Sequence, residues 1–184
     1  MNIGIDLDDT LINLNIVKLT SKEFKFNLNE VKYFDWEMSQ FPKELREEII
    51  RRFTDPRFMC EEPYISFIPN VKNKLDELKQ NNHKLILITA RNKIIRKETK
   101  QLINKVYPNF DKIHIVTRGQ SKLSLFKKEK LDVWVDDHLE NCKRALRLGI
   151  KVYMISNNST PYNHNMKKHR NLKIIEKFTD IDIC

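Results

Sequence analysis

Three acidic residues within four positions stand at the end of the first apolar run of this chain. Ile3 to Ile5 is apolar, and Asp6, Asp8 and Asp9 follow almost at once. Carboxylates this close repel one another and resist ionisation unless a cation or hydrogen-bond donors stabilise them. In α/β proteins, ligands bind just beyond the carboxyl ends of the parallel strands. The spacing therefore predicts a metal ion at the end of a buried strand.

Further polar residues lie at the ends of later apolar runs or near the start of a helical stretch. They are Thr89, Ala90, Arg91, Lys122, Asp136 and Asp137. Parallel strands bring their carboxyl ends to one edge of a sheet, so we expect this set to converge on Asp6 and Asp8. Carboxylate oxygens are ligands that Mg²⁺ prefers. A hydroxyl, backbone N–H groups and a lysine charge can hold a phosphoryl group, so the set suits phosphoryl transfer.

Each of these residues also has a purely structural alternative. Asp6 and Asp8 could form a tight turn, and the Asp136-Asp137 pair could cap the helix that follows. The occurrence of both acidic groups in one chain favours the chemical interpretation. For Arg91 two interpretations stay open, contact with a phosphate or pairing with an acid.

Lys122 is chosen among several nearby lysines by its position. It precedes the body of a helix expected over residues 121–129, and Asp136 follows it by fourteen residues. The other lysines of this stretch fall further along: Lys127, Lys128 and Lys130. A lysine on a helix surface is normally solvated, so the one at the helix start is the better candidate.

Strand-like and helix-like segments alternate along most of the chain, a pattern typical of a parallel α/β sheet. Strands are expected over residues 2–6, 84–89, 113–116, 132–136 and 151–155, and helices over residues 92–107, 121–129 and 139–148. A further helix carries Val71, Leu75 and Leu78 on one face. The apolar runs are continuous, as in strands covered on both faces. The sequence predicts a Rossmann-like, three-layer α/β fold.

Residues 12–68 break this alternation. A crossover between parallel strands needs only a dozen or more residues, whereas this block is far longer and contains a clear helical stretch from Pro42 to Phe53. We therefore expect a small helical cap inserted after the first strand. The predicted division is a core of residues 1–11 and 69–184 and a cap of residues 12–68.

The composition excludes several classes of protein. The chain has 184 residues, of which 40% are hydrophobic and 32% charged, and it has no run of about 18 apolar residues that could span a membrane. Cys60, Cys142 and Cys184 lack metal-like spacing, which favours a reducing, cytoplasmic setting. The net charge of +9 would attract anions. No basic stripe with interleaved aromatics accompanies it, so a nucleic-acid partner is not favoured. A monomer and a homodimer both stay open.

Four ordered motifs carry a resemblance to a known superfamily. They are Ile-Asp6-Leu-Asp8-Asp9-Thr10-Leu11, Ile-Thr89-Ala-Arg91, Lys122 and Val-Asp136-Asp137. In this order they resemble the haloacid dehalogenase (HAD) superfamily, and within it the 5′(3′)-deoxyribonucleotidase family with its helical cap. Response-regulator receivers use similar residues in a different order and have no such insertion. The resemblance implies an enzyme, a Mg²⁺-dependent HAD-type phosphatase whose substrate is a small phosphomonoester, most simply a nucleotide.

The resemblance also implies roles for individual residues. Asp6 would be the nucleophile that forms an aspartyl-phosphate, and Asp8 the general acid and base. Asp6, Asp8 through its backbone carbonyl, and the Asp136-Asp137 pair would hold Mg²⁺. The phosphoryl oxygens would contact Thr89, Ala90, Arg91 and Lys122. Asp9 has no catalytic role and is expected to shape the turn.

Aromatic residues in the predicted cap are candidates for substrate contacts. Phe34 and Trp36 could stack on a base, or they could pack in the core of the cap itself. Two other functions stay open, a phosphatase acting on nucleic-acid ends or another phosphoester, and a non-catalytic nucleotide-binding scaffold. A cap that encloses its ligand favours small substrates over nucleic-acid ends.

Overall fold

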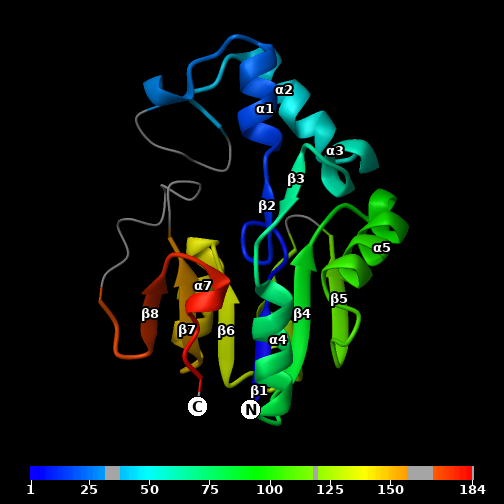
Figure 1. Cartoon of the computed structure of the whole chain (residues 1–184). Coiled ribbons are helices and arrows are strands. Elements are labelled where there is room, and N and C mark those ends of the chain that lie inside the picture. Colours follow the sequence, from blue (N-terminus) through cyan, green and yellow to red (C-terminus); the bar gives the residue numbers. More distant parts are fainter. Residues whose placement is uncertain (32–37, 118–119, 157–167, 184) are drawn as a thin grey trace.

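A six-stranded parallel sheet forms the centre of the computed structural model, which describes residues 1–31, 38–117, 120–156 and 168–183. Its strand order is β5-β4-β1-β6-β7-β8 (Figure 1). The strands are β1 (Asn2–Ile5), β4 (Lys84–Ala90), β5 (Lys112–Val116), β6 (Val133–Asp136), β7 (Lys151–Ile155) and β8 (Leu172–Ile175). Ile5 of β1 pairs with Leu87 on one side and Val135 on the other. The predicted Rossmann-like α/β fold is confirmed.

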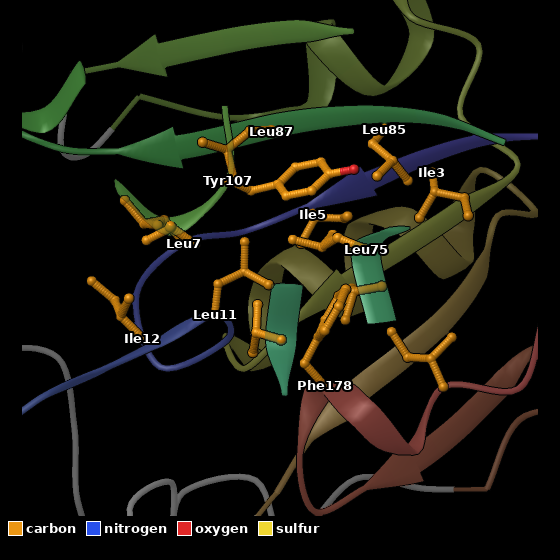
Figure 2. Packing of buried hydrophobic residues seen from close by; sticks show 14 of the residues in the cluster. Ile3, Ile5, Leu7, Leu11, Ile12, Leu75, Leu85, Leu87, Tyr107 and Phe178 are labelled. Atoms are coloured by element: carbon orange, nitrogen blue, oxygen red, sulfur yellow. The ribbon is translucent and has the colours of Figure 1, made fainter. Parts of the chain in front are cut away.

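Helices cover both faces of this sheet. One face carries α4 (Val71–Gln80), α5 (Arg96–Val106) and the 3₁₀ turn η4 (Phe178–Asp180), and the other carries α6 (Leu123–Lys128) and α7 (Leu139–Arg147). Figure 2 shows the first of the two apolar layers, in which Ile3 and Ile5 of β1 meet Leu75 of α4 and Phe178 of η4. Trp134 points to the opposite layer. Both faces of β1, β4, β6 and β7 are buried, which explains their continuous apolar sequences.

The segment between β1 and α4 is a separate structural feature at the carboxyl ends of the strands (Figure 1). Residues 12–68, called the insert below, contain β2 (Ile12–Leu14), α1 (Ile16–Glu23), η1 (Leu28–Glu30), α2 (Lys43–Arg52), α3 (Pro56–Cys60) and β3 (Ile65–Phe67). β2 and β3 pair in antiparallel fashion, with Leu14 opposite Ile65. The helices share a small apolar cluster that includes Ile16, Leu45 and Ile49.

Three details differ from the sequence predictions. Strand β8 was not predicted because it is an edge strand whose Lys173 and Ile174 are exposed, so it lacks a continuous apolar run. The β2–β3 pair was missed because each strand has only three residues. The helix expected over residues 92–107 divides into η2 (Lys93–Ile95) and α5. Among the described helices, none has both the length and the apolar character required to cross a bilayer.

Candidate active site

Three buried aspartates from two neighbouring strands meet at the carboxyl edge of the sheet. Asp6 follows β1, Asp136 ends β6, and Asp137 comes next. One carboxylate oxygen from each residue lies within 4.8 Å of the others. The backbone N–H of Asp6 donates to the carbonyl of Val135 at 2.9 Å, which holds the two strand ends together. Because β1 stands between β4 and β6, where the chain reverses its winding direction, the cluster lies where α/β folds place their ligands.

Lys122 supplies a positive charge inside this cluster. Its Nζ lies 2.8 Å from Oδ1 of Asp6 and 3.4 Å from Oδ2 of Asp136, and its side chain is only 4% exposed. Burial lowers the pKa of Lys122, but the carboxylates of Asp136 and Asp6 outweigh that effect and raise it. The lysines that the sequence analysis set aside, Lys127, Lys128 and Lys130, are exposed. The structure therefore brings only Lys122, of these four described lysines, into the site.

Negative charge is concentrated in this cluster. Three carboxylates meet here, and the ammonium group of Lys122 pairs with two of them, those of Asp6 and Asp136. Burial raises the pKa of Asp6 to about 7, against the opposing effect of Lys122 and with support from the negative charges of Asp136 and Asp8. A bound divalent cation would compensate this charge, and the donor set consists of the hard oxygens that Mg²⁺ prefers. The residues present thus fit a Mg²⁺ ion.

Asp136 is anchored by donors that follow it in the chain. Its Oδ1 accepts the backbone N–H of His138 at 2.7 Å, and its Oδ2 accepts the side-chain amide of Asn141 at 2.9 Å. Asn141 was not predicted as a site residue from the sequence. The sequence does contain a signal for it, because Asn141 is a polar residue beside Cys142 on the buried face of α7. These bonds hold the carboxylate of Asp136 in one orientation.

Asp8 points to a different partner. Nε of Arg91 donates to Oδ2 of Asp8 at 3.0 Å, and Nη2 donates to Oδ1 of the same carboxylate. Nη1 of Arg91 donates to the backbone carbonyl of Met59, at 2.7 Å. Of the two interpretations left open for Arg91, the structure shows the pairing with an acid. The contact with Met59 had no sequence signal, because its acceptor is a backbone carbonyl 32 residues away.

Thr89 and Ala90 are the last two residues of β4, which lies beside β1, the strand that Asp6 follows. Thr89 is completely buried, and its hydroxyl has no hydrogen-bond partner among the described residues. Buried polar groups are nearly always hydrogen-bonded, so such a hydroxyl is available to a ligand. Asp9 has a different environment, with a φ of 51° and its Oδ1 accepting the N–H of Leu14 at 2.9 Å. It orders the turn after β1, as expected. Phe34 and Trp36 lie outside the described residues.

Comparison with known proteins assigns the chain to a family. The family model described as 5′ nucleotidase, deoxy (pyrimidine), cytosolic type C protein matches residues 1–177. The chain belongs to this nucleotidase family. It is 25% identical over 165 residues to YqfW of Bacillus subtilis (strain 168), a protein that carries the name of a nucleotidase, and the match covers 89% of this chain and 82% of YqfW.

Solved structures agree on the fold of this member of the nucleotidase family. CbbY from Rhodobacter sphaeroides, solved in complex with phosphate, aligns with a TM-score of 0.60 at 14% identity over 97% of this chain and 95% of its own. A HAD phosphatase from Thermococcus onnurineus aligns with a TM-score of 0.55 at 16% identity over 96% and 94%. At these identities the similarity bears on the fold alone. The family match confirms the resemblance to the deoxyribonucleotidase family and the prediction of a phosphomonoester hydrolase. The solved structures confirm the HAD-like fold.

Proposed function

We propose that this member of the nucleotidase family is a Mg²⁺-dependent phosphatase that hydrolyses nucleoside monophosphates through an aspartyl-phosphate on Asp6. The observation that carries the proposal is the buried cluster of Asp6, Asp136 and Asp137, in which one carboxylate oxygen from each residue lies within 4.8 Å of the others. Such a site would hold a divalent cation and, through it, a phosphate dianion. Nucleotides are the preferred substrate class because the matching family is described as a 5′ nucleotidase.

The reaction would proceed in two steps. A carboxylate oxygen of Asp6 attacks phosphorus, the ester P–O bond breaks, and the leaving oxygen takes a proton from Asp8. Asp8 then accepts a proton from water, the water oxygen attacks the phosphoenzyme, and the bond between phosphorus and Asp6 breaks to release inorganic phosphate. Acid–base catalysis of this kind contributes about 10²–10⁴-fold to the rate.

The remaining residues would bind and orient. Mg²⁺, when bound, neutralises charge on the phosphoryl group, and Asp6, Asp136, Asp137 and the backbone carbonyl of Asp8 would hold it. Lys122, the hydroxyl of Thr89 and the backbone N–H of Ala90 would contact phosphoryl oxygens, and a buried hydroxyl that lacks a partner supports this role for Thr89. We also propose that residues 12–68 act as a cap over the site. Their helices lie beyond the carboxyl ends of the strands (Figure 1).

The test compares two substitutions of the same kind in one loop. Asp6→Asn should abolish release of phosphate from p-nitrophenyl phosphate and from nucleoside monophosphates in the presence of Mg²⁺. Asp9→Asn is the matched control, because an asparagine oxygen can still accept the N–H of Leu14 and Asp9 lies outside the acidic cluster. Full activity of Asp6→Asn would show that the nucleophile is assigned wrongly.

A substrate comparison tests the nucleotide part of the proposal. Initial rates are measured on 5′- and 3′-nucleoside monophosphates, on sugar phosphates and on oligonucleotides phosphorylated at one end. We expect mononucleotides to be hydrolysed fastest, because a cap encloses small substrates more readily. A strong preference for oligonucleotides would contradict the proposal and assign the activity to nucleic-acid ends.

The family description and the free thiols Cys60 and Cys142 support a cytoplasmic location.

A further inference from the structure

Arg91 is a buried charged residue that joins the insert to the candidate active site. It follows β4 directly, and its side chain is completely buried. Two of its nitrogen atoms donate to the two carboxylate oxygens of Asp8. The third donates to the backbone carbonyl of Met59 in α3, and it lies 3.5 Å from Sγ of Cys60. One guanidinium group therefore contacts both the loop after β1 and the last turn of α3.

The acceptors of the Arg91 guanidinium group indicate the function of this residue. All three nitrogen atoms of Arg91 already donate to Asp8 or Met59, and the side chain has no exposed surface. The contacts proposed for phosphoryl oxygens come instead from Lys122 and Thr89. A two-point contact between a guanidinium and a carboxylate restrains orientation as well as position. A carboxylate has about four lone-pair sites, so Asp8 keeps lone pairs beyond those that accept from Arg91.

We propose that Arg91 is the positioning residue that holds Asp8 for proton transfer and ties the orientation of Asp8 to the position of α3. The proposal rests on the proposed phosphatase function and deepens it. In this role Arg91 acts through Asp8 and does not contact the substrate. Any displacement of α3 relative to the core changes the hydrogen bonding of the same guanidinium that orients Asp8. A lysine could supply the charge but not the two-point contact.

Substrates with different leaving groups separate positioning of Asp8 from a general structural effect. p-Nitrophenolate is a stable anion and departs without a proton, whereas the alkoxide of a nucleoside needs one. The ratio kcat/KM covers the steps up to release of the leaving group and excludes hydrolysis of the phosphoenzyme. A misplaced Asp8 therefore lowers kcat/KM for a nucleoside 5′-monophosphate much more than for p-nitrophenyl phosphate.

The first variant is Arg91→Lys, and Arg52→Lys is its matched control. We expect Arg91→Lys to lower kcat/KM for the nucleotide about 10–100-fold, which is within the range of general acid catalysis, and for p-nitrophenyl phosphate by less than about threefold. Arg52 is also buried and also pairs with a carboxylate, that of Glu23 within the insert. Arg52→Lys should change both substrates by the same factor. An equal loss on both substrates in Arg91→Lys would overturn the proposal.

A second pair of variants covers the case in which Arg91→Lys does not fold. Asp8→Asn is compared with the double variant Asp8→Asn/Arg91→Met, which removes the buried guanidinium and its partly buried carboxylate partner together, so that neither charge is left unpaired. If Arg91 acts through Asp8, the two variants have the same ratio of kcat/KM between the two substrates. A further selective loss in the double variant would refute the proposal. The proposed function itself fails in a different way, through a wild-type protein without activity or an Asp8→Asn variant without leaving-group dependence.

Discussion

Magnesium should stabilise the fold of this protein against unfolding. The physical reason is the concentration of negative charge in the buried cluster, where the carboxylates of Asp6, Asp136 and Asp137 meet. The ammonium group of Lys122 lies 2.8 Å from Asp6 and 3.4 Å from Asp136. A cation that binds the folded state alone stabilises it by about 2.7 kcal/mol at a concentration of 100 Kd. For chains of this length, about 1 kcal/mol corresponds to a shift of about 2–4 °C in Tm. The expected increase is therefore about 5–11 °C.

The assay is thermal unfolding of chelator-treated protein followed during a titration with MgCl₂. Asp137→Asn removes one of the three carboxylates that would hold the cation. We expect Mg²⁺ to raise the Tm of this variant by less than it raises the Tm of the wild type. Asp9→Asn is the control, because Asp9 lies outside the cluster and accepts the N–H of Leu14. Its response to Mg²⁺ should equal that of wild type.

Two results would refute this reasoning. An increase in Tm that is unchanged in Asp137→Asn would place the stabilising ion somewhere other than the acidic cluster. A wild-type Tm that does not respond to Mg²⁺ at any concentration would mean that Lys122 and proton uptake by the carboxylates already compensate the buried charge. The raised pKa of Asp6 makes proton uptake the main competitor of the metal, so the titration is best done above pH 7.

Three further predictions address packing, pH and phosphate binding. Gly4→Ala should lower the free energy of unfolding in urea by about 1–3 kcal/mol, because an added Cβ would lie 2.5 Å from Cδ1 of Leu131 and 2.7 Å from the ring of Trp134. An unchanged midpoint would show that both side chains can move. Glu48→Gln should lower the free energy of unfolding by about 1 kcal/mol at pH 7 and leave it unchanged near pH 2. The hydrogen bond from Arg51 holds the pKa of Glu48 in the folded protein at about 2, so the stabilisation by Glu48 is present above its unfolded pKa of about 4.5 and is lost as the pH falls towards 2. An equal decrease in the free energy of unfolding at both pH values would contradict this. Thr89→Val should leave Tm nearly unchanged but raise KM for phosphomonoesters about tenfold or more, since the lost hydrogen bond is to a charged group; an unaltered KM would remove Thr89 from the phosphate site.

The central sheet could be predicted from sequence because burial on both faces leaves a clear signal. β1, β4 and β6 are runs of apolar residues flanked by polar ones, and their parallel pairing brings Asp6, Thr89 and Asp136 to one edge. Once the strands are located, the topology alone places the strand-end residues together. β8 lacked this signal because it has one exposed side and lies at the edge of the sheet.

Contacts that depend on the insert could not be predicted in this way. Arg91 pairs with Asp8 across 83 residues and with the carbonyl of Met59 across 32. A backbone carbonyl has no side-chain identity, so no sequence pattern marks it as an acceptor. Sequence reasoning could state only that Arg91 either reaches a phosphate or pairs with an acid, and three-dimensional packing of α3 against the core decides between them.

The acidic loop after β1 shows how tertiary partners distinguish chemically identical side chains. Asp6, Asp8 and Asp9 lie within four positions, yet each carboxylate meets a different group. Asp6 enters the buried cluster with Lys122, Asp8 meets the guanidinium of Arg91, and Asp9 accepts a backbone N–H of β2 from a left-handed turn. The partners belong to separate segments of the chain, so spacing alone locates the three acids but cannot assign them. Their different environments would allow one short loop to supply the nucleophile proposed for Asp6, the proton-transfer group proposed for Asp8 and a structural turn at Asp9.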